Sequence, residues 1–210
     1  AIPLIIGNVS DRELVRTIIT DHAIDAVIHF AGFLLVEESV KDPIKYMKNN
    51  VVGPIAMLEA MRETGVKKII FSSTAAVYGT PVVTPIPEHH QKEPGSPYGV
   101  SKWCFEEMLN QYDKLAGIRS VSLRYFNAAG ASPAGNRGED HAIETHLIPL
   151  ACQTALGKRT DMKVYGTDYK TPDGTAVRDY IHIEDLCQSH LLALDALANG
   201  HKTDTYNVGT

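Results

Sequence analysis

A tyrosine and a lysine four residues apart, Tyr98 and Lys102, form the pattern in this sequence with the clearest chemical meaning. Four residues are slightly more than one helical turn, so on a helix the two side chains share a face. A lysine ammonium beside a phenol favours the phenolate, because opposite charge stabilises the ionised form. Thr74 closes the apolar segment 69–74, and we expect its hydroxyl in the same pocket. The three groups predict a site that removes a proton from an alcohol while hydride leaves the same carbon.

The elements that must position these groups alternate between strand and helix, which predicts an α/β fold with a doubly wound parallel sheet. We expect strands at residues 3–6, 25–30, 67–72, 120–125 and 205–208, and a short one near Val164. We expect helices after the capping pattern at 10–13, then over 36–64 with a break near Pro43, and over 98–115, 143–156 and 185–198.

The texture of the sequence changes after Asn127. Residues 128–140 are rich in glycine, alanine and proline, which predicts a loop or flap instead of a helix or strand.

Composition excludes several classes of function. The 210 residues are 44% hydrophobic and 21% charged, which is ordinary for a globular protein, and no apolar run reaches the roughly 20 residues of a membrane span. The net charge of −5 contains no basic block, so nucleic acid is not an expected partner. Three cysteines without a C-x-x-C pair indicate reduced thiols and a cytoplasmic location. The histidines lack H-E-x-x-H spacing, so we predict no metal site.

A parallel sheet with this Tyr-Lys pair predicts a nicotinamide cofactor, whose pyrophosphate normally rests on a glycine-rich first turn. The sequence contains no G-x-G-x-x-G segment. We therefore expect these residues to be an internal piece of a longer protein, without its glycine-rich start and its C-terminal part.

Longer motifs make the resemblance specific. The segments HFAG, NNV, FSSTAAVYG and SPYGVSK occur in the order typical of extended short-chain dehydrogenases/reductases, at residues 29–32, 49–51, 71–79 and 96–102. Three further segments, LRYFN, GTDY and DGTAVRDYIH, resemble more narrowly the UDP-glucose 4-epimerases, at residues 123–127, 166–169 and 173–182. The similarity covers nearly the whole chain. It implies a Rossmann-like NAD-binding sheet in residues 1–127, without its first strand-helix-strand unit, and a small substrate lobe or flap in residues 128–177. Residues 178–210 would return to the sheet.

The resemblance implies an isomerase of galactose metabolism that interconverts UDP-glucose and UDP-galactose through a transient 4-keto sugar, with tightly bound NAD. Tyr98 would take the proton of the sugar 4-hydroxyl, and Lys102 would lower the pKa of that phenol and bind the nicotinamide ribose. Thr74 would bind the sugar oxygen. The family also implies a homodimer formed through the helices of residues 36–64 and 98–115.

The resemblance assigns further binding residues one by one. The cofactor would be held, besides Tyr98 and Lys102, by Asn8, Val9, Phe30, Ala31, Gly32, Asn49 and Phe126. The UDP-sugar would be held, besides Thr74, by Asn127, His146, Leu147 and Arg178, the last by a charge-assisted contact with the diphosphate.

Alternative functions remain open at this point. A sugar-nucleotide dehydratase needs acidic residues after the strand-end threonine, and this chain has Ala75 and Ala76 there. UDP-N-acetylglucosamine and UDP-glucuronate 4-epimerases are two further candidates. The non-enzymatic alternative is an inactive, truncated domain that binds nucleotide sugars.

Overall fold

The computed structural model describes residues 2–210 and divides them into two compact units. The first unit comprises residues 2–125 and 189–208, and the second comprises residues 126–188 and 209–210. Each unit is described by itself.

The first unit is built on a four-stranded, entirely parallel sheet. Its strands are β1 (Val27–His29), β2 (Lys68–Thr74), β3 (Arg119–Tyr125) and β6 (Asp204–Val208), in the spatial order β1-β2-β3-β6. Ile69, Ile70 and Phe71 of β2 are almost fully buried, as expected for a parallel strand covered on both faces. The predicted parallel α/β fold is confirmed.

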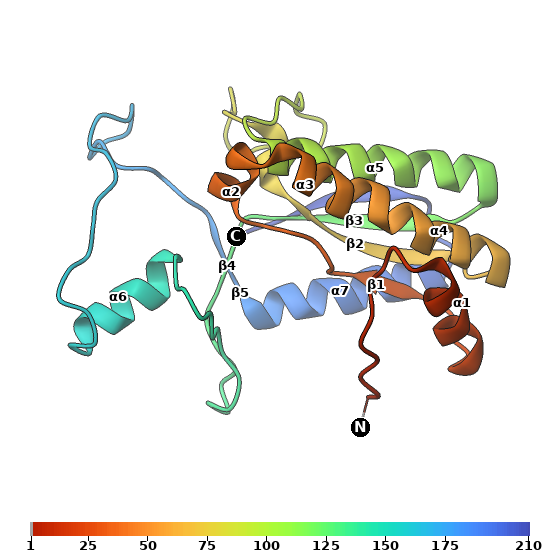
Figure 1. Cartoon of the computed structure of the whole chain (residues 1–210). Coiled ribbons are helices and arrows are strands. Elements are labelled where there is room, and N and C mark those ends of the chain that lie inside the picture. The colour runs from red at the N-terminus through yellow and green to blue at the C-terminus, as the bar shows by residue number, and fades with distance from the viewer. Residues whose placement is uncertain (1) are drawn as a thin grey trace. The chain divides into compact units, whose positions relative to one another are not determined.

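Helices lie on both faces of this sheet (Figure 1). One face carries α4 (Gly53–Thr64) and α5 (Pro97–Ala116), and the other carries α7 (Ile183–Ala198). The remaining elements of the unit are α1 (Arg12–Asp21), α2 (Val36–Lys41), α3 (Pro43–Met47), the π-helical turn η1 (Lys48–Val52) and the 3-10 turn η2 (Ala75–Tyr78). None of the helices in residues 2–210 combines the length and apolarity needed to cross a membrane.

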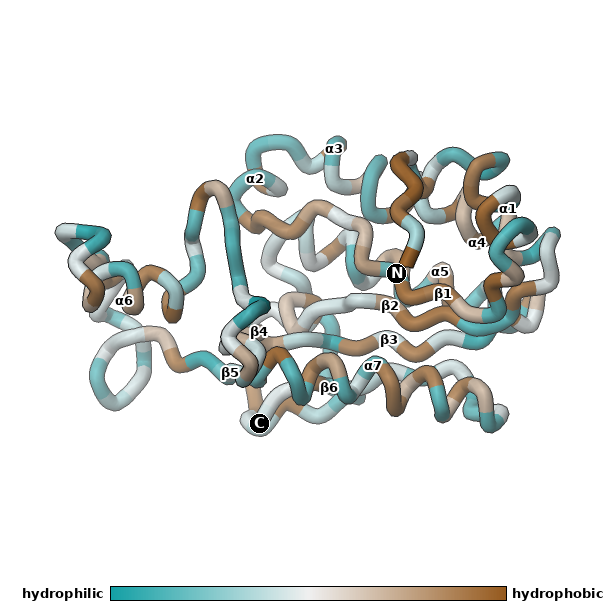
Figure 2. Tube along the Cα trace, turned by 90° about the horizontal axis from the view of Figure 1, so that it is seen from below, coloured by the Kyte–Doolittle hydropathy of each residue, from teal (hydrophilic) through white to brown (hydrophobic). Residues whose placement is uncertain are grey.

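The core forms where α4 and α5 pack on β2. It includes Met57, Leu58 and Met61 of α4, Ile69 and Phe71 of β2, and Phe105 and Leu109 of α5. Figure 2, which is coloured by hydropathy, shows hydrophobic residues along the middle strands of the sheet, beside this core.

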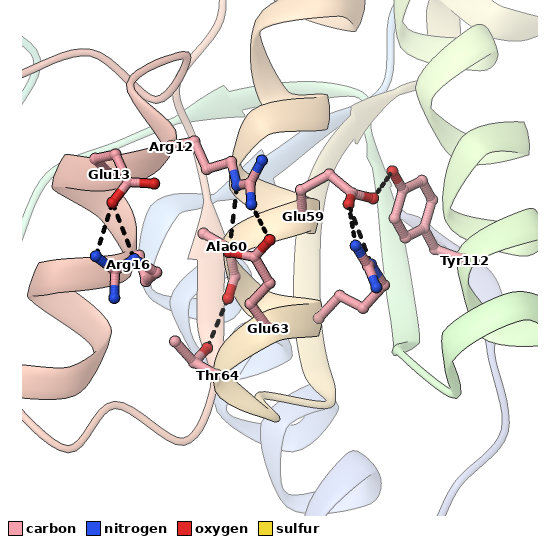
Figure 3. A network of polar contacts seen from close by, with 9 residues as sticks. Arg12, Glu13, Arg16, Glu59, Ala60, Glu63, Thr64 and Tyr112 are labelled. Carbon is pink, nitrogen blue, oxygen red and sulfur yellow. Dashed lines mark hydrogen bonds and ion pairs between the residues drawn. The ribbon is translucent and has the colours of Figure 1, made fainter.

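Polar contacts reinforce this packing at the helix surfaces. Arg12 of α1 pairs with Glu63 of α4, and the Tyr112 hydroxyl of α5 donates to Glu59 of α4 at 2.6 Å (Figure 3). These contacts tie α1 and α5 to α4.

The second unit contains a two-stranded parallel pair, β4 (Asn127–Ala129) with β5 (Tyr180–His182), and the helix α6 (Leu147–Ala155). The sequence did not predict β4 and β5, because three residues are too few to display a strand period.

Two predicted strands are wrong. Residues 3–6 form no strand, and the side chains of Leu4 and Ile6 are 89% and 92% exposed. The segment near Val164 also has no strand, and Val164 is 67% exposed. Both segments were assigned from apolar residues alone, but a strand also needs a hydrogen-bonded neighbour, and the described part of the chain offers neither segment one.

Candidate active site

The beginning of α5 is specified by local sequence. The Ser96 hydroxyl caps the helix by accepting a hydrogen bond from the Gly99 amide at 3.2 Å, and Pro97 occupies the first helical position. Tyr98 therefore lies in the first turn and Lys102 one turn later, as the spacing predicted.

Gly99 lets this turn approach the end of β2 closely. A Cβ atom at Gly99 would lie 2.7 Å from the Ala76 carbonyl oxygen and 2.9 Å from the Pro94 side chain. Ala76 belongs to η2, which directly follows Thr74, and its amide donates to the Thr74 hydroxyl at 3.1 Å. The absent side chain of Gly99 thus allows Tyr98 and Thr74 to come together.

Lys102 is buried, with only 5% of the residue exposed. Its Nζ donates to the Ser72 carbonyl oxygen at 2.9 Å and lies 5.0 Å from the ring centre of Phe71 and 5.9 Å from that of Tyr98. Burial lowers the pKa of Lys102 to about 8, because desolvation disfavours the ammonium.

Burial also raises the pKa of the Tyr98 phenol above its usual value, and the hydrogen bond with Thr74 offsets part of that rise. The Lys102 ammonium donates to the Ser72 carbonyl oxygen. That Lys102 lowers the pKa of Tyr98 stays a prediction.

The backbone after β1 passes close to Lys102. A Cβ at Gly32 would lie 3.4 Å from the Lys102 Nζ and 3.3 Å from the Asn50 carboxamide oxygen. Asn50 accepts from the Phe33 amide at 2.8 Å, and its Nδ2 donates to the Phe33 carbonyl at 3.0 Å and to the Ser101 hydroxyl at 3.1 Å. Asn50 thereby fixes the loop after β1 to the lysine-bearing helix.

Asn50 was missed as a positioning residue, whereas its neighbour Asn49 was assigned to the cofactor. Asn49 is half-buried and donates to the Asn50 carboxamide oxygen at 3.0 Å. Both lie in the π-helical turn η1, an element that often marks functional positions. The doubled asparagine at 49–50 was the available signal.

A second missed residue is His29, at the end of β1. Its ring stacks 5.8 Å from Phe71 and lies 5.4 Å from Phe105, and the residue is 3% exposed. Burial, together with the nearby Lys102 charge, lowers the pKa of His29 to about 4. The imidazole is therefore neutral at neutral pH.

The segment that follows β1 is open. Phe30 is 60% exposed and its ring centre lies 5.0 Å from that of His190, and Ala31 is also exposed. Ligands of parallel α/β sheets bind at the carboxyl ends of the strands, and Phe30, Thr74 and Tyr98 lie at that edge. An exposed aromatic ring there is suited to contact with a planar ligand.

A buried ionic network connects the elements that carry the site residues. The Glu106 carboxylate of α5 accepts a hydrogen bond from the Ser73 hydroxyl at 2.5 Å. It also accepts from Nε and Nη2 of Arg124 of β3, at 2.9 and 2.5 Å. Arg124 also donates to the Tyr78 hydroxyl at 2.6 Å. The network connects β2, β3, η2 and α5, and the sequence did not reveal it because its members are far apart along the chain.

Asn8 and Val9, assigned to the cofactor, precede α1. The Asn8 side chain accepts from both the amide and the hydroxyl of Ser10, each at 2.9 Å, and so closes a turn; Val9 is half-buried.

The residues assigned to the UDP-sugar, except Thr74, lie in the second unit. The Asn127 side chain donates to the Asp179 carbonyl at 2.6 Å. Arg178 is exposed and donates to the Val177 carbonyl at 2.9 Å, while the Asp179 carboxylate accepts from Thr210 at 3.0 Å. Arg178 thus keeps an exposed guanidinium that suits an anion.

Three further assigned residues, His146, Leu147 and Phe126, belong to this unit. His146 and Leu147 are exposed at the start of α6, with His146 as its N-cap. Phe126, assigned to the cofactor, is half-buried and lies 3.1 Å from the position of a Cβ at Gly209.

Comparison with known proteins yields one family and a consistent set of relatives. The model of the NAD dependent epimerase/dehydratase family matches residues 1–209. UDP-glucose 4-epimerase of Lacticaseibacillus casei is 48% identical over 204 residues, which are 97% of this chain and 62% of the relative.

Two crystal structures extend the comparison. UDP-glucose 4-epimerase from Brucella ovis in complex with NAD superposes with a TM-score of 0.94 at 45% identity, covering 98% of this chain and 63% of that one. The enzyme from Bifidobacterium longum, in complex with NAD+ and UDP, gives 0.88 at 42% identity, covering 97% and 62%. The chain thus spans about three fifths of the length of these relatives.

Proposed function

Because the chain belongs to the NAD dependent epimerase/dehydratase family, we propose that it carries the catalytic residues of a UDP-glucose 4-epimerase. This enzyme interconverts UDP-glucose and UDP-galactose through a transient 4-keto sugar. The observation that carries the proposal is the convergence of Thr74, Tyr98 and Lys102 at the carboxyl edge of a parallel sheet. The names of the relatives support it.

The residues at this edge fit a nicotinamide dinucleotide. Gly32 leaves the backbone free of a side chain beside the Lys102 ammonium, which suits hydroxyl groups of a ribose. Phe30 exposes an aromatic ring, and Asn49 is half-buried beside them in η1. When bound, NAD would accept and return a hydride and would bring a positively charged ring.

The chain's own groups handle the proton. Tyr98 would accept the proton of the sugar 4-hydroxyl and later return it, while the Thr74 hydroxyl holds the sugar oxygen. A phenol that titrates near pH 10 needs a shift of about 3 pKa units, or ~4 kcal/mol, to act at neutral pH. Since burial raises the pKa of Tyr98, positive charge has to supply this shift, and Lys102 is the nearby cation.

The UDP part would be held by the second unit, through Asn127, His146, Leu147 and Arg178. The exposed Arg178 guanidinium supports a contact with the diphosphate. Epimerisation is favoured over dehydration because Ala75 and Ala76, next to Thr74, have no group that transfers protons.

We also propose a homodimer formed through the segment α2–α4 and through α5. The support is a set of exposed apolar residues on that segment, namely Val36, Val40, Ile44 and Val52, which are between 49% and 63% exposed.

The reaction is tested by product analysis. The chain is grafted into the L. casei relative in place of the matching segment and incubated with NAD and UDP-galactose, and proton NMR follows the sugar. We expect UDP-glucose as the product. A 4-keto-6-deoxy product, or no conversion although both ligands bind, would contradict the proposal.

A further inference from the structure

We propose that Glu139, His141, Glu144 and His146 form a binding site for a divalent transition-metal ion of the zinc class. The four residues lie in the second unit, in the segment that leads into α6. One ligand atom from each residue lies within 4.8 Å of all the others. The inference goes beyond the proposed function and does not depend on it.

The distances between the ligand atoms suit a small ion. His141 Nδ1 lies 3.0 Å from a Glu139 oxygen and 3.6 Å from a Glu144 oxygen, and His146 Nδ1 lies 3.9 Å from the other Glu144 oxygen. Ligands bound to zinc at about 2.0–2.1 Å in a tetrahedron are roughly 3.3 Å apart. His146 Nδ1 also pairs with Glu139. Zinc coordination would therefore need side-chain movements between a few tenths of an ångström and about 1.5 Å, since the ligand atoms now lie up to 4.8 Å apart.

The kinds of ligand select the metal. Calcium and magnesium prefer shells made of oxygen atoms alone, whereas imidazole nitrogens suit zinc, copper, nickel and cobalt. Two imidazoles with two carboxylates therefore favour a transition metal over magnesium.

The carboxylates are held before any metal binds. One Glu144 oxygen accepts from the backbone amides of Thr145 at 2.7 Å and His146 at 2.8 Å, and the Glu144 side chain is 8% exposed. Hydrogen bonds of this kind orient metal ligands and support their affinity. The imidazoles of His141 and His146 are 46% and 49% exposed, which gives an ion a path of entry.

The site gives His146 a second role, and this step rests on the proposed function. His146 would ligate the metal through Nδ1, which leaves its Nε2 to donate to a phosphate as proposed above. The ion would also fix the segment ahead of α6, where Leu147 begins the helix. The absence of H-E-x-x-H spacing led to the prediction of no metal site, but the ligands here follow the different spacing E-x-H-x-x-E-x-H.

The test measures metal binding by the 210-residue chain itself, independently of catalysis. The purified chain is stripped with a chelator and titrated with Zn²⁺ in a calorimeter, and in parallel with Co²⁺ while the visible spectrum is recorded. We expect saturation at one ion per chain, the strong absorption of four-coordinate Co²⁺, and no competition from excess Mg²⁺.

The variant His141→Ala/His146→Ala should lose this binding by more than the roughly 10- to 100-fold that changes outside the ligand shell cost. The control His22→Ala/His89→Ala removes two exposed histidines elsewhere and should bind as the parent does. Glu144→Gln is a second, milder variant that should also weaken Zn²⁺, with an unchanged circular dichroism spectrum as proof of folding. Equal binding by the ligand variants, or weak uptake without fixed stoichiometry by the parent, would overturn the proposal.

Discussion

Burial decides the protonation states of the residues around the candidate active site. Lys102 and His29 are both buried, and burial lowers the pKa of each. The positive charge of Lys102 lowers the pKa of His29 further. Because His29 is neutral at neutral pH, Lys102 is the positively charged member of this pair.

His29 predicts a specific loss of stability in acid. Its pKa is about 4 in the folded chain and near 6.5 in the unfolded chain, so between these values only the unfolded chain takes up the proton. Stability from this group is therefore full above about pH 6.5 and is lost as the pH falls toward 4. We expect His29→Phe, which retains an aromatic ring against Phe71, to be less acid-sensitive than the parent by about 2 kcal/mol at about pH 5. Urea unfolding at two pH values measures this, and an equal acid loss in both proteins would refute the assignment.

Replacing Lys102 should change stability and activity in opposite directions. Its pKa is about 8 in the folded chain and 10.5 when unperturbed, so the unfolded chain binds the proton more tightly and stability rises with pH across that window. Below pH 8 the buried ammonium costs up to about 3 kcal/mol. We expect Lys102→Met to unfold at higher urea than the parent near neutral pH, without this pH slope, and to lose epimerisation.

The control for that experiment is Lys114→Met, an exposed lysine on the same helix. It should change neither the stability nor its pH dependence. A Lys102→Met protein that is less stable and fully active would show that the ammonium serves packing instead of chemistry.

Single residues differ in how far the sequence reveals them. The types and spacing of Thr74, Tyr98 and Lys102 predicted that they converge, and the structure places them together. The roles of His29 and Asn50 depend on contacts with distant segments, so no local pattern identifies them. The sequence also does not show that burial raises the pKa of Tyr98 or that the Lys102 Nζ donates to the Ser72 carbonyl oxygen.

At the level of elements, the contact between α5 and η2 depends on Gly99. Because a Cβ would meet the backbone of Ala76 at 2.7 Å, Gly99→Ala has to push the first turn of α5 away from Thr74. We expect a destabilisation of about 1–3 kcal/mol and a loss of activity beyond that of the folded fraction. Urea unfolding and the epimerase assay on the folded protein measure the two effects.

The matched control is Gly95→Ala, four residues earlier. Among the described residues, apart from its two chain neighbours, no atom lies within 4 Å of a Cβ at Gly95, and its backbone is not in the left-handed region. This variant should be neutral, and equal effects of the two substitutions would contradict the close-approach argument.

Elements with strong local signals were predicted from the sequence. The capping serine and proline set the start of α5, and Gly117, with φ of +65°, ends it. The failures were segments whose state depends on a partner, namely residues 3–6 and the short pair β4–β5. A strand is fixed by its neighbour in the sheet as much as by its own residues.

At the level of the whole molecule, the exposed apolar residues of α2–α4 predict self-association. Ile44 is 60% exposed and Val40 is 63% exposed. We expect Val40→Asp/Ile44→Asp to dissociate a dimer that the parent forms, because charges in an apolar interface are costly to desolvate. Sedimentation velocity measures the mass of each protein, and a monomeric parent would remove the dimer proposal.

The division into a sheet region, residues 1–127, a substrate lobe, residues 128–177, and a return at residues 178–210 remains a prediction. The structure separates two compact units, with residues 189–208 in the first. The chain spans about three fifths of the length of its relatives. The activity is therefore to be measured after the chain has been grafted into a full-length relative.

The most direct test of the account is the rate of UDP-galactose conversion by Tyr98→Phe in the L. casei graft. Tyr112→Phe is the matched control, since Tyr112 lies on the same helix and its hydroxyl donates to Glu59 of α4. With NAD and substrate binding retained, we predict that Tyr98→Phe is slower by about 10²- to 10⁴-fold and that Tyr112→Phe turns over like the parent. A Tyr98→Phe enzyme that converts UDP-galactose at the parental rate would contradict the account.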